Sequence, residues 1–122
     1  MNGYQMGEME FRFAELIWKH APVASGELVR LCAEAFNWKK STTYTMLHRL
    51  CERGIFENPD GTVRALLTRK EYQSLQTEAF VEETFSGSLP GFLAAFASRR
   101  ALSEEDVAAL EQLIDAYRKE EE

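Results

Sequence analysis

The stretch KKSTTYTMLHRLCERGIFENPDGTVR, residues 39–64, gathers the side chains of this sequence that are best suited to binding a polyanion. Between residues 39 and 69 there are six basic residues and three acidic ones, although the whole chain carries a net charge of −6. Short hydroxyl side chains and a histidine lie among them. Lysine and arginine contact phosphate, whereas Ser, Thr and Arg can also reach the edges of DNA bases. The composition of this stretch therefore indicates DNA binding.

A helix predicted at about residues 41–53 would place the polar side chains of this stretch on one face. At about 100° per residue, the opposite and buried face holds Thr43, Met46, Leu47 and Leu50. The polar face is centred on Ser41, Thr45, His48 and Glu52, with Tyr44 and Arg49 at its edges. Such a face fits the major groove of DNA, because short hydroxyls allow close approach to the bases. A polar face that is only solvated is the alternative interpretation.

Basic residues flank this face on both sides. Lys39 and Lys40 stand at the start of the helix, where backbone N–H groups also favour phosphate. Arg64 follows the next turn of the chain and is placed to hold the DNA backbone beside the groove. The predicted DNA-binding residues are Lys39, Lys40, Ser41, Thr42, Tyr44, Thr45, His48, Arg49, Arg53 and Arg64.

The elements expected around this helix follow the order of a winged helix-turn-helix. The first helix covers about residues 8–20 and ends before Pro22, and the second covers about 26–36 with Ser25 as its N-cap. PVAS between them is interpreted as a short extended link. IFE and TVRALLT, joined by NPDG, predict a two-stranded hairpin. We therefore predict a mainly α fold with a small β-hairpin wing; a generic small helical domain ending in a hairpin is the alternative.

Charge and apolar pattern predict a second, helical part. Residues 1–70 carry 10 Lys and Arg against 8 Asp and Glu, whereas residues 71–122 carry 4 against 12. We therefore predict a winged-helix DNA-binding domain at 1–70 and a helical domain at 71–122. Two capping-box patterns, at 68–71 and 103–106, begin two of its helices, the first of which runs to about residue 85. A short helix lies between them at about 89–98.

Apolar side chains in this second part need a partner. In the last helix they repeat every 3.5 residues, which suits packing against another helix. Packing onto helices of the same chain is the alternative to packing on a second copy. The candidate dimerisation residues are Phe85, Leu89, Phe92, Leu93, Phe96, Val107, Leu110, Ile114 and Tyr117.

Several function classes find no support in these residues. The chain has two His, and it has no metal-ligand spacing, no nucleophile elbow and no phosphate-binding loop. We therefore expect that it is not an enzyme and that it has neither a cofactor nor a metal site. Cys32 and Cys51 form no CxxC pair and are expected to be reduced core thiols. No apolar run reaches 18 residues, and the first ten residues lack the pattern of a signal peptide. A cytoplasmic location without membrane insertion is therefore expected.

An ordered set of residues resembles the BlaI/MecI-type penicillinase repressors, bacterial winged-helix transcription factors with copper-responsive CopY-type relatives. The resemblance runs from about residue 6 to 119 and is strongest in IWKHAPV and TTYTMLHRLCERG. The matching positions are Glu10, Trp18, Lys19, His20, Trp38, Thr42, Thr45, Met46, Leu47, Arg49, Leu50 and Gly54. The resemblance implies a homodimer that occupies a palindromic operator on double-stranded DNA and represses transcription by occluding a promoter.

The resemblance also implies a way to end repression. In antibiotic-responsive members a membrane sensor protease acts after detecting a β-lactam, and the family position places the cut between Ala95 and Phe96. The family often has Asn before the scissile Phe, so Ala95 departs from it there. Lys39-Lys40 replaces a common Ser-Pro, and the returning wing strand RALLT is aliphatic. Copper-responsive relatives carry a C-terminal cysteine cluster, which this chain lacks.

Two other functions fit the same residues. A winged-helix module that binds proteins and has lost DNA binding is one, because the chain is acidic overall and its wing departs from the family pattern. A PadR-like regulator, another small winged-helix type with a helical dimer arm, is the other. Mutation of Arg49 and Thr45 separates the first of these from a repressor.

Overall fold

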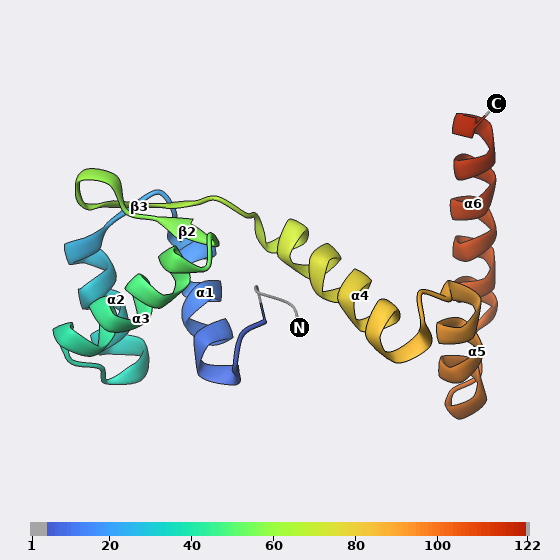
Figure 1. Cartoon of the computed structure of the whole chain (residues 1–122), viewed down its shortest axis with the longest axis horizontal. Helices are drawn as coiled ribbons and strands as arrows, with labels where there is room; N and C mark the ends of the chain where they lie inside the picture. The colour runs from blue at the N-terminus through green and yellow to red at the C-terminus, as the bar shows by residue number, and fades with distance from the viewer. Residues whose placement is uncertain (1–4, 122) are drawn as a thin grey trace. The chain divides into compact units, whose positions relative to one another are not determined.

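The computed structural model describes residues 5–121 and has the predicted fold class, with six helices and one small antiparallel sheet in that range (Figure 1). The chain divides into two compact units between Phe80 and Val81. The N-terminal unit contains α1 (Glu8–His20), β1 (Val23–Ala24), α2 (Ser25–Phe36), α3 (Lys40–Glu52), β2 (Phe56–Glu57) and β3 (Thr62–Ala65). The helix α4 (Arg69–Phe85) begins in this unit.

The first helix has the predicted bounds. At its start the Gly7 N–H donates to Glu10 Oε1 at 3.0 Å, which satisfies one of the free backbone donors of the first turn. At its end Lys19 and His20 lie where positive charge complements the helix dipole. Pro22 follows directly and cannot continue the helix.

Ser25 is not the N-cap of the second helix, contrary to expectation. It is the first residue of α2, and the N-cap position belongs to Ala24, which makes no side-chain bond to the helix. The Ser25 hydroxyl oxygen instead accepts a hydrogen bond from the Tyr44 hydroxyl at 3.2 Å. This bond joins the start of α2 to α3. The end of α2 is closed by Asn37 in the left-handed conformation, with φ of 56°.

The wing contains the predicted hairpin and one strand more. β2 and β3 pair antiparallel with Phe56 opposite Ala65, and the connection between them contains Asp60 and Gly61, both at positive φ. The segment interpreted as an extended link also pairs with β3, with Val23 opposite Val63, so the sheet order is β1-β3-β2. Both valines are buried, which explains why this short strand forms.

One hydrophobic core holds the three helices on the sheet. Its fully buried members include Phe13 and Ile17 of α1, Leu28 and Cys32 of α2, Leu50 of α3, and Ile55, Phe56 and Val63 around the sheet. Burying a Leu, Ile or Phe side chain contributes about 1.5–3 kcal/mol. Because residues of α3 take part, this helix is fixed in position and rotation.

The start of α4 is attached to the N-terminal unit. Thr68 and Glu71 form the predicted capping box, with the Thr68 N–H donating to Glu71 Oε1 at 2.9 Å and the Glu71 N–H donating to Thr68 Oγ1 at 3.0 Å. The Trp18 indole N–H donates to the Leu67 carbonyl at 2.9 Å. The buried Tyr72 ring stacks on Phe11 at 5.8 Å between centroids.

The C-terminal unit consists of the end of α4 with α5 (Leu89–Arg99) and α6 (Glu104–Glu121). The Ser88 hydroxyl accepts from the Gly91 N–H at 2.9 Å, and the Ser103 hydroxyl accepts from the Asp106 N–H at 3.0 Å, which confirms the second capping box. No residue between 81 and 121 is buried. Within the described range, no helix has the length and apolar character needed to cross a membrane.

Candidate nucleic-acid interface

The two faces of α3 separate as the helical wheel predicts. Thr43, Leu47 and Leu50 are buried against the core, and Met46 is half-buried. On the opposite side a row of four side chains is exposed, namely Ser41, Thr45, His48 and Glu52. This row is called the polar face below. Because the core fixes the buried side, the polar face has a defined direction toward solvent.

The N-terminus of α3 leaves backbone donors available. Lys39 is the N-cap, and its side chain makes no capping bond. The first main-chain bond of the helix joins the Thr43 N–H to the Lys39 carbonyl at 3.1 Å. The N–H groups before Thr43 are therefore the kind of donors that bind phosphate at a helix start. The Lys40 ammonium lies 5.9 Å from the centre of the Tyr44 ring, so positive charge is held near this end.

Tyr44, Arg49 and Arg53, the C-cap of α3, have different surroundings. Tyr44 is half-buried, and its hydroxyl donates to Ser25, so its ring is held at the edge of the polar face. Arg49 is exposed, with one guanidinium nitrogen 3.8 Å from the Met46 sulfur. Arg53 donates to the Gln5 carbonyl at 2.9 Å and pairs with Glu10 at 3.2 Å. The charge of Arg53 is therefore already matched within the N-terminal unit.

The wing adds one cation and one side chain that sequence reasoning missed. Arg64 is exposed on β3 opposite Glu57 of β2. A groove between α3 and the start of the wing connection is lined by Tyr44, Leu47, His48, Cys51 and Asn58. Asn58 is a polar side chain at the rim of the polar face. The NPDG motif predicts a chain reversal, and the motif alone does not place Asn58 beside the polar face.

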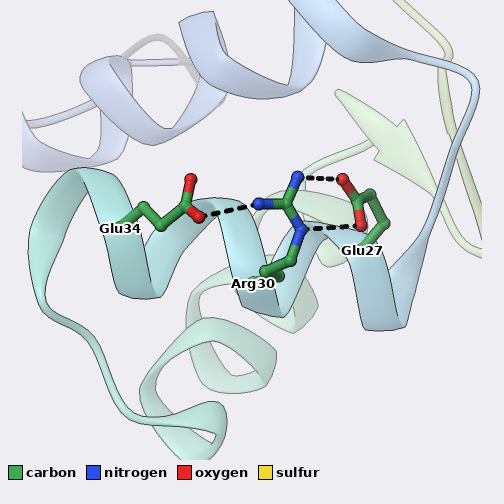
Figure 2. A network of polar contacts seen from close by, with 3 residues as sticks. All are labelled: Glu27, Arg30 and Glu34. Atoms are coloured by element: carbon green, nitrogen blue, oxygen red, sulfur yellow. Dashed lines mark hydrogen bonds and ion pairs between the residues drawn. The ribbon is translucent and has the colours of Figure 1, made fainter.

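The outer face of α2 carries a matched cation, shown in Figure 2. The Arg30 guanidinium donates two hydrogen bonds to Glu27, one of them from Nε to Oε2 at 3.0 Å, and a third to Glu34 at 2.8 Å. The Arg30 hydrogen bond, with its positive charge, holds the pKa of Glu27 below the usual range. The three side chains together are negative, so this arginine contributes no free positive charge for phosphate.

Cys32 and Cys51 are both free thiols, as expected, but only one is a core residue. Cys32 is fully buried, whereas Cys51 is half-buried and lines the groove beside the polar face. Burial raises the pKa of both thiols, and the charge of Glu57 adds to the shift of Cys51.

The candidate dimerisation residues are largely exposed in the single chain. Leu89, Phe96, Val107, Ile114 and Tyr117 are exposed, and Leu113, which sequence reasoning missed, is 67% exposed. Phe85, Phe92, Leu93 and Leu110 are half-buried, with the rings of Phe85 and Phe92 5.8 Å apart. Ala95 and Phe96 lie inside α5 and are exposed.

Comparison with known proteins connects this arrangement to one family. The family model for the penicillinase repressor matches residues 6–116, which include the winged helix and most of the helical C-terminal unit. A penicillinase repressor from Bacillus licheniformis is 23% identical over 118 residues, which cover 93% of this chain and 92% of the relative. The resemblance stated from the residues of α1 and α3 is thereby confirmed. The chain belongs to the penicillinase repressor family.

Proposed function

We propose that this chain is a homodimeric, sequence-specific transcriptional repressor that occupies a palindromic operator, and not an enzyme. The polar face of α3 is the observation that carries the proposal, because it is exposed on a helix whose other side is fixed in the core. Membership of a repressor family supports it. We assign DNA binding to residues 1–70 and dimerisation to 71–122, and we expect the protein to act in the bacterial cytoplasm.

The polar face suits the major groove. The groove admits one α-helix, and the hydroxyls of Ser41 and Thr45 are short enough to bring it close to the bases. Arg49 at the edge can reach a guanine or a phosphate. Lys39, Lys40 and the free N–H groups of the first turn bind the backbone at one end, and Arg64 binds it beside the groove. Phosphate contacts thus set the position while the polar face reads sequence.

The exposed apolar side chains of α5 and α6 support the proposed dimer. A unit with no buried residue between 81 and 121 has little to hold its helices together, and a second copy supplies the missing surface. A monomer with few cations would bind DNA weakly, at roughly 10⁻⁴–10⁻⁶ M at physiological salt. Two copies on half-sites about 34–36 Å apart gain affinity through effective concentration. Dimerisation is therefore part of recognition.

Proteolysis within α5 is the proposed way to end repression. A cut between Ala95 and Phe96 would separate α6 from the winged helix and return the DNA-binding part to its weak monomeric state. Both residues are exposed, but they are helical, so α5 must open locally before a protease can hold them. The sensor protease of antibiotic-responsive members is the proposed partner.

Selection of bound DNA from a random pool tests the proposal. We expect a two-fold symmetric consensus, and affinity that falls steeply as salt rises. Thr45→Ala and Arg49→Ala should weaken this binding while size-exclusion chromatography still shows the dimer, because both side chains lie far in sequence from α5 and α6. Full-length protein that selects no consensus, with its fold and dimer intact, would instead favour a winged-helix module that binds proteins.

A further inference from the structure

Glu52 is the acidic member of the polar face of α3. Its Oε1 lies 2.8 Å from Nε2 of His48, and the two side chains are 68% and 73% exposed. Exposed ion pairs of this kind add little to stability. A carboxylate on the face that meets a polyanion opposes non-specific binding, so its contribution has to lie in discrimination between sequences.

The position of Glu52 along α3 decides what it meets. At about 1.5 Å per residue, the row from Ser41 to Glu52 is about 16 Å long, which matches about five base pairs at about 3.4 Å each. Ser41 stands at the end that carries Lys39, Lys40 and the free N–H groups. Glu52 stands in the last turn, at the opposite end of the row. With α3 lying along the groove, as proposed, Glu52 therefore faces the base pair farthest from the phosphate contacts of the helix start.

The chemistry of a carboxylate restricts the base that it accepts. An ionised carboxylate only accepts hydrogen bonds, and in the major groove only cytosine N4 and adenine N6 donate them. Adenine places the N7 acceptor beside its amino group, which repels the second carboxylate oxygen. Guanine and thymine present no hydrogen-bond donor at this edge. Cytosine is therefore the base that suits Glu52.

His48 contacts one oxygen of this carboxylate. The nitrogen that lies 2.8 Å from Glu52 must carry a hydrogen, because the carboxylate has none to give. One oxygen of Glu52 is thereby held by the imidazole, and the other is left for a base. We propose that Glu52, positioned by His48, determines specificity by reading a cytosine at the far end of each half-site. This inference rests on the proposed function.

The test is random-pool selection with full-length variants, followed by affinity measurement on operators altered at single base pairs. The native protein should select C·G at one symmetric pair near the end of α3, and replacing it should weaken binding roughly five- to hundredfold. Glu52→Ala should lose this preference alone. Glu52→Gln should shift it toward adenine, because glutamine pairs with N6 and N7.

Three further variants isolate the roles of His48 and of charge. His48→Ala should relax the preference at the same base pair, whereas His48→Gln, which can still donate to Glu52, should keep it. Glu34→Gln is the matched control, because Glu34 is 66% exposed, also belongs to an (i, i+4) ion pair and lies on α2. It removes the same charge and should leave the consensus unchanged.

The outcomes separate this inference from the function on which it rests. If Glu52→Ala and Glu52→Gln bind all sequences more tightly with an unchanged consensus, Glu52 only repels phosphate and the inference is overturned while the repressor stands. If the native protein selects no symmetric consensus, both the inference about Glu52 and the proposed function are overturned. Thermal unfolding of each variant should match the native protein, since both side chains are exposed.

Discussion

Arg49 of α3 and Arg53, the C-cap of this helix, lie four residues apart, and the fold gives their guanidinium groups different surroundings. Arg49 is exposed at the edge of the polar face, whereas Arg53 binds the Gln5 carbonyl and a Glu10 carboxylate that is only 17% exposed. The sequence places both arginines in one basic stretch, because Glu10 is too distant along the chain for local spacing to reveal the pair.

Replacing each arginine by alanine should therefore give opposite results. Arg53→Ala should lower the free energy of unfolding by about 1 kcal/mol, because it leaves the half-buried Glu10 carboxylate unpaired. The effect is no larger because water partly solvates this carboxylate. Arg49→Ala should leave stability unchanged and weaken operator binding about tenfold or more. Urea denaturation and fluorescence anisotropy with labelled operator measure the two effects. Equal loss of DNA binding in both variants would contradict this division.

The two thiols provide a second comparison at the residue scale. Thiolates are the reactive form, and the raised pKa of both cysteines keeps them protonated at neutral pH. We expect slow alkylation by iodoacetamide at pH 7, faster reaction as pH rises, and Cys51 modified before the buried Cys32. Because Cys51 lines the groove beside the polar face, bound operator should slow its alkylation further. Mass spectrometry of peptides measures which cysteine is alkylated first. If bound operator slowed the alkylation of Cys32 and not that of Cys51, the prediction would be contradicted.

At the scale of elements, the helices follow from local pattern. Phe13 and Ile17 are spaced for one face of a helix, and α1 has the predicted bounds. The polar face of α3 was predictable for the same reason, since a wheel needs only neighbouring residues. The spacing of Glu27, Arg30 and Glu34 along one helix also indicates their pairing.

The elements that escaped prediction depend on distant residues. β1 has two residues, which is too short to show alternation, and its partner Val63 lies 40 positions after Val23. Ser25 has the side chain of an N-cap, but its hydroxyl is engaged by Tyr44 of the next helix. The ion pair between Arg53 and Glu10 likewise joins residues that are far apart in the sequence. Each depends on tertiary contact, which local propensity does not contain.

The capping box of α4 permits a test at this scale. Thr68→Ala should lower the free energy of unfolding by about 1 kcal/mol, because it removes the acceptor of the Glu71 N–H. Thr68→Ser, which keeps the hydroxyl, is the matched control and should stay near the native value. Chemical denaturation monitored by circular dichroism measures both. A serine variant as unstable as the alanine variant would show that the methyl group, and not the bond, matters.

At the scale of the whole molecule, the pairing of two chains is the property to test. Ile114 is half-exposed on the apolar stripe of α6 and should be covered in the dimer. Ile114→Asp should shift the protein to monomer and weaken operator binding by two orders of magnitude or more, since effective concentration is lost. Gln112→Asp, on another side of the same helix, should stay dimeric. Light scattering after size exclusion reports the mass; a dimeric Ile114→Asp protein would place the interface elsewhere.

The lack of buried residues between 81 and 121 should make the behaviour of the protein depend on its concentration. In the proposed dimer a partner chain covers these helices, so folding of this half and pairing would form one equilibrium governed by mass action. Its melting temperature should climb as the solution is made more concentrated, while that of the winged helix, which has its own core, stays constant. When cell growth dilutes the protein, the proposed dimer would dissociate. Operator occupancy should then fall more steeply than the number of protein copies per cell.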